Sequence, residues 1–95
     1  MGPEVITREE LNRWAATWER YALRADSAAR EWAEIAADPT QSRSARIGAL
    51  RATRTVRANA AEYRAEAAVM RGGEVPESYW HLYTTDPDAT RPTAP

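Results

Sequence analysis

Apolar residues recur at alternating intervals of three and four in the N-terminal part of the chain. The members of this stripe are Leu11, Trp14, Trp18, Tyr21, Ala25, Ala28, Trp32 and Ile35. Beside it, alanines repeat every seven residues, at Ala15, Ala22, Ala29 and Ala36. A 3.5-residue period places side chains along one side of an α-helix and favours a left-handed supercoil with a partner helix. A β-strand is excluded here, because strand side chains alternate with a period of two.

A capping box indicates where this helix begins. Thr7 opens the run T-R-E-E, in which the Thr7 hydroxyl accepts a backbone N–H and the Glu10 side chain reaches back to the cap. We therefore expect residues 1–6 to form an N-terminal arm and residues 7–37 to form the first helix.

A second helix start follows almost without a connection. Asp38 is a favoured N-cap residue, and Pro39 suits the first helical position. Gly72 and Gly73 then provide the kind of backbone on which helices commonly end. We expect the second helix to span residues 38–71.

Two such helices, each roughly 45 to 50 Å long at 1.5 Å per residue, are expected to pack as an antiparallel hairpin. The second helix has its own apolar stripe, formed by Ala45, Ala49, Ala52, Val56, Ala60, Tyr63, Ala67 and Met70. With so short a connection, Trp18 faces Ala60, and most large residues face alanines across the seam. In the same register, Arg57 lies near Glu19. The sequence thus predicts an all-α, coiled-coil-like hairpin with an Ala-rich seam.

The chain changes character after the second helix. We expect residues 72–83 to form a Gly-Gly hinge followed by a short aromatic segment, with a short helix that starts at Pro76. Residues 84–95 contain three prolines and no large apolar residue, and we expect them to form a disordered tail.

The aromatic segment permits two interpretations. Tyr79, Trp80 and Tyr83 either fold back over the open end of the hairpin, near Leu11, Ile6 and Met70, or bind a partner. His81 lies in the same segment and is interpreted as an aromatic contact, because no sequence context of a catalytic triad surrounds it.

Composition excludes several chemistries. The chain has no Cys and a single His, so thiolate nucleophiles, disulfides and the usual zinc sites are excluded. All 13 basic residues are Arg, so no Lys can complete a phosphate-binding loop. We expect no catalytic residue, no metal and no cofactor, and hence a protein that is not an enzyme. The bias towards Ala and Arg indicates a high-GC bacterium or a phage. Without an apolar run long enough to span a membrane, or a secretory signal, the expected location is cytoplasmic and no membrane partner is expected.

The arginines form the clearest charge pattern. From Pro39 to Arg71 there are seven Arg and two Glu, a net charge of +5, whereas Glu4 to Asp38 has five Arg and eight acids, a net charge of −3. Four arginines lie within about 40° of one another on a helical wheel, namely Arg46, Arg57, Arg64 and Arg71. This row is a candidate site for nucleic-acid phosphates or another anion. Alternatively, its members pair with acids of the first helix.

A second apolar stripe lies on the opposite side of the predicted second helix. Its members are Ile47, Leu50, Ala58, Ala61, Ala65 and Ala68. A hairpin can bury only one face, and a chain of this length seldom has enough core on its own. We therefore expect either self-association into a homodimer or higher oligomer, such as a four-helix bundle, or binding to a larger partner. The candidate protein interface comprises Ile47, Leu50, Ala58, Ala61, Tyr79, Trp80 and Tyr83.

The function predicted from these features is a non-enzymatic hairpin that acts through protein–protein contacts, as an oligomer, an adaptor or a subunit of a larger bacterial or phage assembly. The alternative is a regulator that binds nucleic acid through the arginine row. In length, the hairpin also resembles the small secreted helical-hairpin proteins of type VII secretion, the WXG100 and PE families, which form four-helix dimers. The turn A-D-P-T-Q departs from their pattern, because it has no Trp-x-Gly. A secreted protein of this architecture is a second alternative that the resemblance implies.

Overall fold

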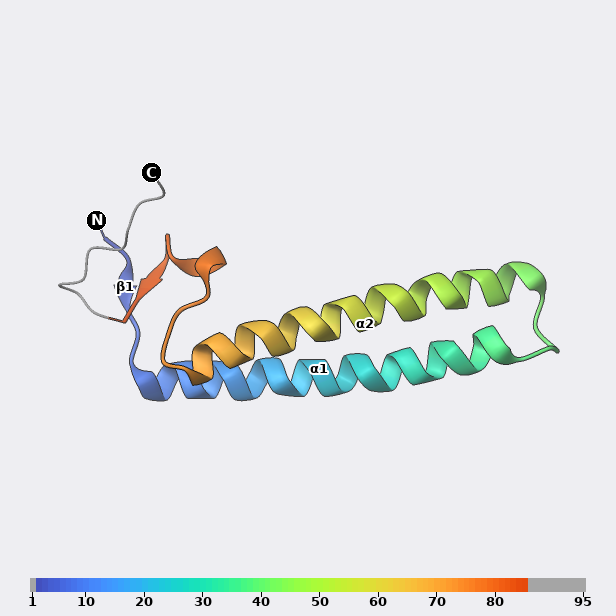
Figure 1. Cartoon of the computed structure of the whole chain (residues 1–95), viewed down its shortest axis with the longest axis horizontal. Coiled ribbons are helices and arrows are strands. Elements are labelled where there is room, and N and C mark those ends of the chain that lie inside the picture. The colour runs from blue at the N-terminus through green and yellow to red at the C-terminus, as the bar shows by residue number, and fades with distance from the viewer. Residues whose placement is uncertain (1, 86–95) are drawn as a thin grey trace.

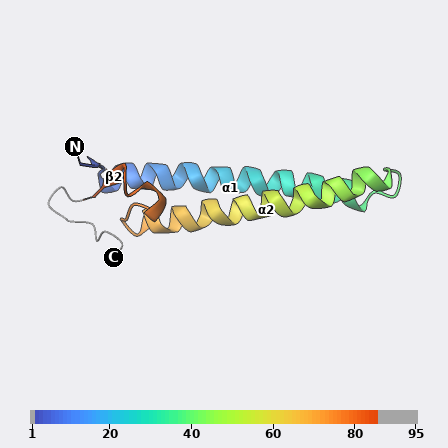
Figure 2. The same ribbon diagram turned by 90° about the horizontal axis from the view of Figure 1, so that it is seen from above.

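Two long antiparallel helices lie side by side in the computed structural model, which describes residues 2–85 (Figure 1, Figure 2). Helix α1 spans Arg8–Ala37 and helix α2 spans Arg43–Arg71. Their 30 and 29 residues correspond to about 45 Å each at 1.5 Å per residue. The predicted all-α hairpin is therefore confirmed.

Helix α1 begins with the capping box that the sequence indicates. The backbone N–H of Glu10 donates to the Thr7 hydroxyl at 3.1 Å, and the backbone N–H of Thr7 donates to the Glu10 carboxylate at 2.9 Å. Both bonds satisfy N–H groups that a helix N-terminus otherwise leaves without partners.

The connection between the helices differs from the prediction. Asp38 is the C-cap of α1, and its carboxylate accepts hydrogen bonds from the backbone N–H of Thr40 at 2.9 Å and from the Thr40 hydroxyl at 2.7 Å. With Asp38 held in this turn, Ser42 is the N-cap of α2 and accepts from the backbone N–H of Ala45 at 3.1 Å. The second helix therefore begins at Arg43, and the prediction that it starts at residue 38 was wrong.

The longer connection moves the register of the hairpin by about one helical turn. The ring of Trp18 lies 6.4 Å from that of Tyr63, and its Nε1–H donates to Glu66 at 2.5 Å. The expected placement of Trp18 opposite Ala60 was wrong for this reason. Likewise, Glu19 pairs with an arginine near the end of α2 and not with Arg57.

Small residues form the buried seam between the helices. Ala15, Ala22 and Ala29 of α1 are buried, and so are Ala49, Thr53, Ala60 and Ala67 of α2. The Thr53 hydroxyl donates to the carbonyl of Ala49 at 2.8 Å, which satisfies the buried polar group. Three of the four heptad alanines of α1 therefore occupy the seam, and the stripe of large apolar residues, apart from the buried Leu11, lies along its edge.

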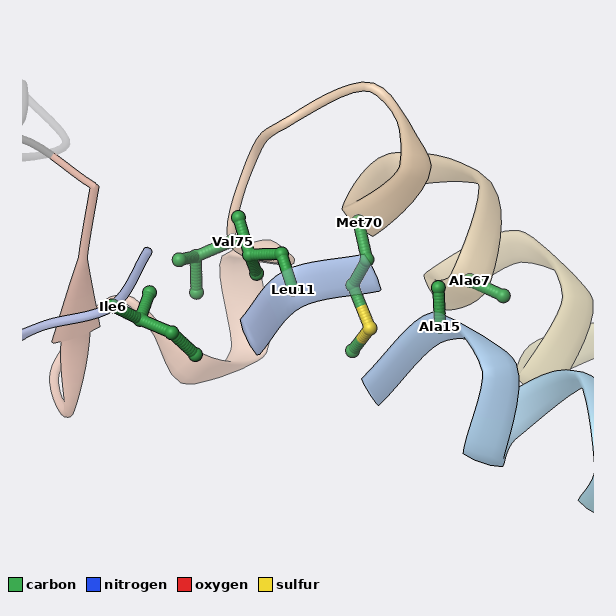
Figure 3. Close-up of a cluster of buried hydrophobic side chains, with 6 residues drawn as sticks. All are labelled: Ile6, Leu11, Ala15, Ala67, Met70 and Val75. Carbon is green, nitrogen blue, oxygen red and sulfur yellow. The ribbon is translucent and has the colours of Figure 1, made fainter. Parts of the chain in front are cut away.

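A cluster of buried hydrophobic side chains lies at the open end of the hairpin (Figure 3). Its members come from the N-terminal arm, both helices and the segment after α2, namely Ile6, Leu11, Ala15, Ala67, Met70 and Val75. Tyr79, Trp80 and Tyr83 pack against this cluster, so the first of the two interpretations of the aromatic segment is the one the structure adopts.

Two short strands hold the segment after α2 in place. Strand β1, Glu4–Val5, pairs in parallel with strand β2, Tyr83–Thr84, and the short helix η1 spans Glu77–Tyr79. The backbone N–H of Ile6 donates to the carbonyl of Thr84 at 2.8 Å, and Thr84 is buried. The predicted tail therefore includes one residue that belongs to this strand pair. Residues 86–95 of the predicted tail lie outside the described residues.

Candidate protein interface

The large apolar stripe of α1 is incompletely covered by α2. Tyr21 and Trp32 retain 39% and 41% of their surface exposed, although both belong to the stripe that the sequence places nearest the partner helix. Because the Ala15 heptad faces α2, the stripe beside it is left at the edge of the seam. We call its uncovered part, together with the apolar residues of α2 on the same side, the aromatic face. It consists of Tyr21, Ala25, Ala28, Trp32 and Ile35 of α1 and Ala45, Ala52, Val56 and Tyr63 of α2.

The Tyr21 ring of the aromatic face packs against two other rings. The Tyr21 ring lies 5.6 Å from both the Trp18 ring and the Tyr63 ring, and the Tyr21–Tyr63 pair meets at 60°. The Arg24 guanidinium lies 5.9 Å from the centre of the Tyr21 ring, on the outer edge of this face. These contacts hold Tyr21 in place while more than a third of its surface remains exposed.

The other end of the stripe is covered by the segment after α2, residues 74–85, which we call the C-terminal cap. The Tyr83 ring meets that of Trp14 edge-on at 4.9 Å. The Trp80 Nε1–H donates to the carbonyl of Val75 at 2.7 Å, and this bond joins two residues within the cap. Between the cap and α1 lies a hollow of about 280 Å³, lined by Trp14, Trp18, Tyr79, Leu82 and Tyr83.

Glu66 is the polar anchor of this arrangement. Its carboxylate accepts from the indole N–H of Trp18 and, at 3.4 Å, from the Tyr79 hydroxyl. Burial, together with the negative charge of Glu66, raises the pKa of the Tyr79 phenol, so Tyr79 stays protonated and donates. One side chain of α2 thereby links α1 to the C-terminal cap.

The seven residues predicted as a protein interface fall into two places. Ile47, Leu50, Ala58 and Ala61 are exposed on the side of α2 that faces away from α1, with 44% of Ile47 and 47% of Leu50 accessible. Tyr79, Trp80 and Tyr83 are half-buried in the C-terminal cap. The structure does not bring these two sets together.

The predicted arginine row is likewise divided. Arg71 Nη2 lies 2.6 Å from the Glu19 carboxylate, and Arg64 pairs with Asp26. Hydrogen bonds from these guanidinium groups lower the pKa of both carboxyls below their ordinary values. Arg57 is exposed, and Arg46 is half-buried near the turn. Two of the four arginines therefore pair with acids of α1, as the alternative interpretation of the row predicts.

Sequence reasoning did not single out the aromatic face as the incompletely covered surface. The relevant signal was present, because α1 carries two apolar sets side by side and a single partner helix can cover only one of them. Which set faces α2 depends on how α1 is rotated about its own axis, and the two sets are too close together on the helix for the sequence alone to decide this.

Other kinds of site receive no support from the part of the chain that the structure describes. Within residues 2–85, no helix combines the length and apolar character needed to cross a membrane, and no three potential ligands gather to hold a metal ion. Comparisons with known protein families, curated proteins and solved structures gave no match for this chain.

Proposed function

We propose that this chain is a non-enzymatic interaction protein that pairs with a second copy of itself through the aromatic face, giving an antiparallel four-helix bundle. The observation that carries the proposal is the exposure of Tyr21 and Trp32, two large aromatic side chains, on the stretch of the stripe that the C-terminal cap, as far as the structure describes it, leaves open. Aromatic side chains with this much apolar area are typical of the centres of protein interfaces.

The distribution of the core supports a second layer. Among the described residues, the largest fully buried side chains are Leu11, Met70 and Val75, and all three belong to the open end. Along the rest of the seam the helices bury mainly alanines, and each alanine contributes a single methyl group. A second copy would cover the side of the seam where larger apolar groups remain exposed.

The C-terminal cap favours one direction of pairing. It covers the stripe at Trp14 and Trp18, so it stands on the same face as the proposed interface. Two copies paired with their caps at the same end would collide. With the copies antiparallel, each cap lies beyond the turn of the other copy, and the open stretches from Tyr21 to Ile35 meet.

Sequence symmetry around Ala28 fits this arrangement. Tyr21 and Ile35 lie seven residues on either side of Ala28. A two-fold axis near Ala28 therefore places Tyr21 of each copy opposite Ile35 of the other copy. Ala25 and Ala28 provide the small surface against which Trp32 of the other copy can pack.

Charges at the edge of the face are complementary in the same arrangement. Arg24 and Glu31 lie on one edge of α1, on opposite sides of Ala28 in sequence. Antiparallel pairing about Ala28 brings Arg24 of each copy next to Glu31 of the other. Exposed pairs of this kind contribute little to affinity, about 0 to 1 kcal/mol each, but they disfavour other registers.

Sedimentation equilibrium of the full chain tests the proposal. We expect a species of twice the 10.6 kDa mass of one chain. Trp32→Glu should shift it to the monomer, because it places a charge in the proposed interface, while circular dichroism should show that the helices persist.

Leu23→Glu is the matched control. Leu23 is the most exposed large apolar residue of α1, with 64% of its surface accessible, and it lies away from the aromatic face. This variant should remain dimeric. A wild-type chain that stays monomeric up to millimolar concentration, or equal loss of the dimer in both variants, would overturn the proposal.

The arginine row gives less support to the nucleic-acid alternative, because Arg64 and Arg71 are engaged by acids of α1. The location of the protein in the cytoplasm stays a prediction from the sequence.

A further inference from the structure

The first half of α2 carries an exposed surface on which arginines surround two aliphatic side chains. We call it the arginine face, and its members are Arg43, Arg46, Ile47, Leu50, Arg51, Arg54 and Arg57. At 100° per residue they occupy an arc of about 140° on the side of α2 away from the aromatic face. Ile47 and Leu50 are each nearly half exposed here.

The surface is hollowed on both sides of Ile47. One open hollow of about 440 Å³ is lined by Ala36, Arg43, Arg46, Ile47 and Leu50. The other, of about 540 Å³, is lined by Arg43, Ser44, Ile47, Gly48 and Arg51. Gly48 widens the second hollow, because it has no side chain and nothing lies within 4 Å of where one would begin. An apolar side chain of a partner could enter either hollow and contact Ile47.

The charge of this surface is largely uncompensated. No acidic residue occurs between Pro39 and Ala61, whereas five arginines do. The ion pairs that join α2 to α1 involve Arg64 and Arg71, which lie beyond this surface. The pKa values of Asp38 and Asp26 are lowered mainly by hydrogen bonds with other residues, and the charges of Arg46 and Arg57 respectively are the smallest of the causes.

Arg46 adds a second, independent observation. Its Nε is buried and has no hydrogen-bond partner among the described residues. A buried donor without an acceptor carries a cost in free energy. A carboxylate in the hollow lined by Arg46 would offset this cost once the guanidinium turns its Nε towards the hollow.

These features specify the chemistry of the partner. Carboxylates are needed to neutralise the arginines, and apolar side chains are needed to cover Ile47 and Leu50. A nucleic acid meets the first need through its phosphates, but it offers far less aliphatic surface to Ile47 and Leu50 than an amphipathic helix does. We propose that the arginine face binds an acidic amphipathic helical segment of another protein. This binding site is separate from the aromatic face, so it is available in the monomer and twice in a dimer.

Fluorescence anisotropy with a labelled synthetic probe tests the inference. The probe is an amphipathic peptide of Glu, Leu and Ala in which Leu recurs at helical spacing. We expect it to bind the full chain with an affinity that falls as salt is raised. Ile47→Ser and the double variant Arg43→Gln/Arg46→Gln should each weaken binding by about tenfold or more.

Matched variants and probes give the controls. Leu23→Ser and Arg13→Gln change an exposed apolar residue and an exposed arginine of α1, and both should bind the probe as the wild type does. A peptide with Ser in place of Leu, and one with Lys in place of Glu, should bind at least tenfold more weakly.

Three results would overturn the inference. Equal binding of the Ser-containing peptide would show that the aliphatic residues play no part. Tighter binding of duplex DNA than of the Glu-Leu peptide would identify a nucleic-acid surface. Unchanged affinity of Ile47→Ser, with the helices intact by circular dichroism, would place the contact elsewhere.

Discussion

At the scale of single residues, Glu66 of α2 links its helix both to α1 and to the C-terminal cap. It accepts a hydrogen bond from the indole of Trp18 on α1 and another from Tyr79 in the C-terminal cap. A carboxylate that serves two part-buried donors stabilises the packing between elements, and its removal leaves both donors without their acceptor.

We therefore expect Glu66→Ala to lower the free energy of unfolding by about 1 to 3 kcal/mol, with a loss of near-ultraviolet circular dichroism from the aromatic residues. Urea denaturation measures the first effect. Glu62→Ala, at an exposed position one turn earlier, is the control and should change stability little. Equal stability of the two variants would show that Glu66 does not anchor the cap.

Replacing Gly73 and replacing Gly48 by Ala should have opposite effects on stability. Gly73 has a φ of +86°, and a Cβ at this position would lie 2.5 Å from the Arg8 guanidinium. Gly48 lies inside α2 with open space around it. Gly73→Ala should therefore destabilise the hairpin by about 1 to 3 kcal/mol, and Gly48→Ala should stabilise it by about 0.5 to 1 kcal/mol. Thermal denaturation should show a melting temperature below that of the wild type for Gly73→Ala and above it for Gly48→Ala, and any other order would contradict the prediction.

At the scale of elements, two ion pairs tie the second half of α2 to α1. The pKa values of Glu19 and Asp26 are lowered by hydrogen bonds from Arg71 and Arg64. A carboxyl with a lower pKa in the folded state stabilises that state above its unfolded pKa, near pH 4, and the contribution is lost as the pH falls through the folded value. Since both pairs lie at the surface, the contribution is small.

Between pH 6 and pH 3, the melting temperature of the wild type should therefore fall further than that of the Arg64→Gln/Arg71→Gln double variant. Thermal circular dichroism at each pH measures the difference. The same acid sensitivity in both proteins would mean that these pairs contribute nothing to the pH dependence.

The elements also show what the sequence could predict. The capping box at Thr7 and the glycines after Arg71 are local signals, and both mark real helix ends. The turn was mispredicted because Asp38 and Ser42 are both good N-cap residues, and local propensity does not decide between them. In the structure Asp38 accepts from Thr40 within the turn and Ser42 caps α2, and this later start moves the register by about one turn.

At the scale of the whole molecule, the rotation of α1 about its own axis determines which apolar set is buried. In the structure the heptad alanines face α2, Trp18 lies beside Tyr63, and the larger stripe is left at the edge. The sequence predicted an incompletely buried surface and a need for a partner, but it assigned the surface to the outer stripe of α2, with Ile47 and Leu50, and to the aromatic segment after α2. Those residues are indeed exposed, and the aromatic face was missed because its exposure follows from three-dimensional packing.

The central claim is that two copies meet at the aromatic face about an axis near Ala28. The chain contains no Cys, so Ala28→Cys introduces a single thiol without interference. Under mild oxidation it should form a covalent dimer rapidly, because the axis brings each thiol close to its own counterpart. Leu23→Cys, on another side of α1, should react slowly. Equal rates for the two variants, or no covalent dimer from Ala28→Cys, would contradict the account.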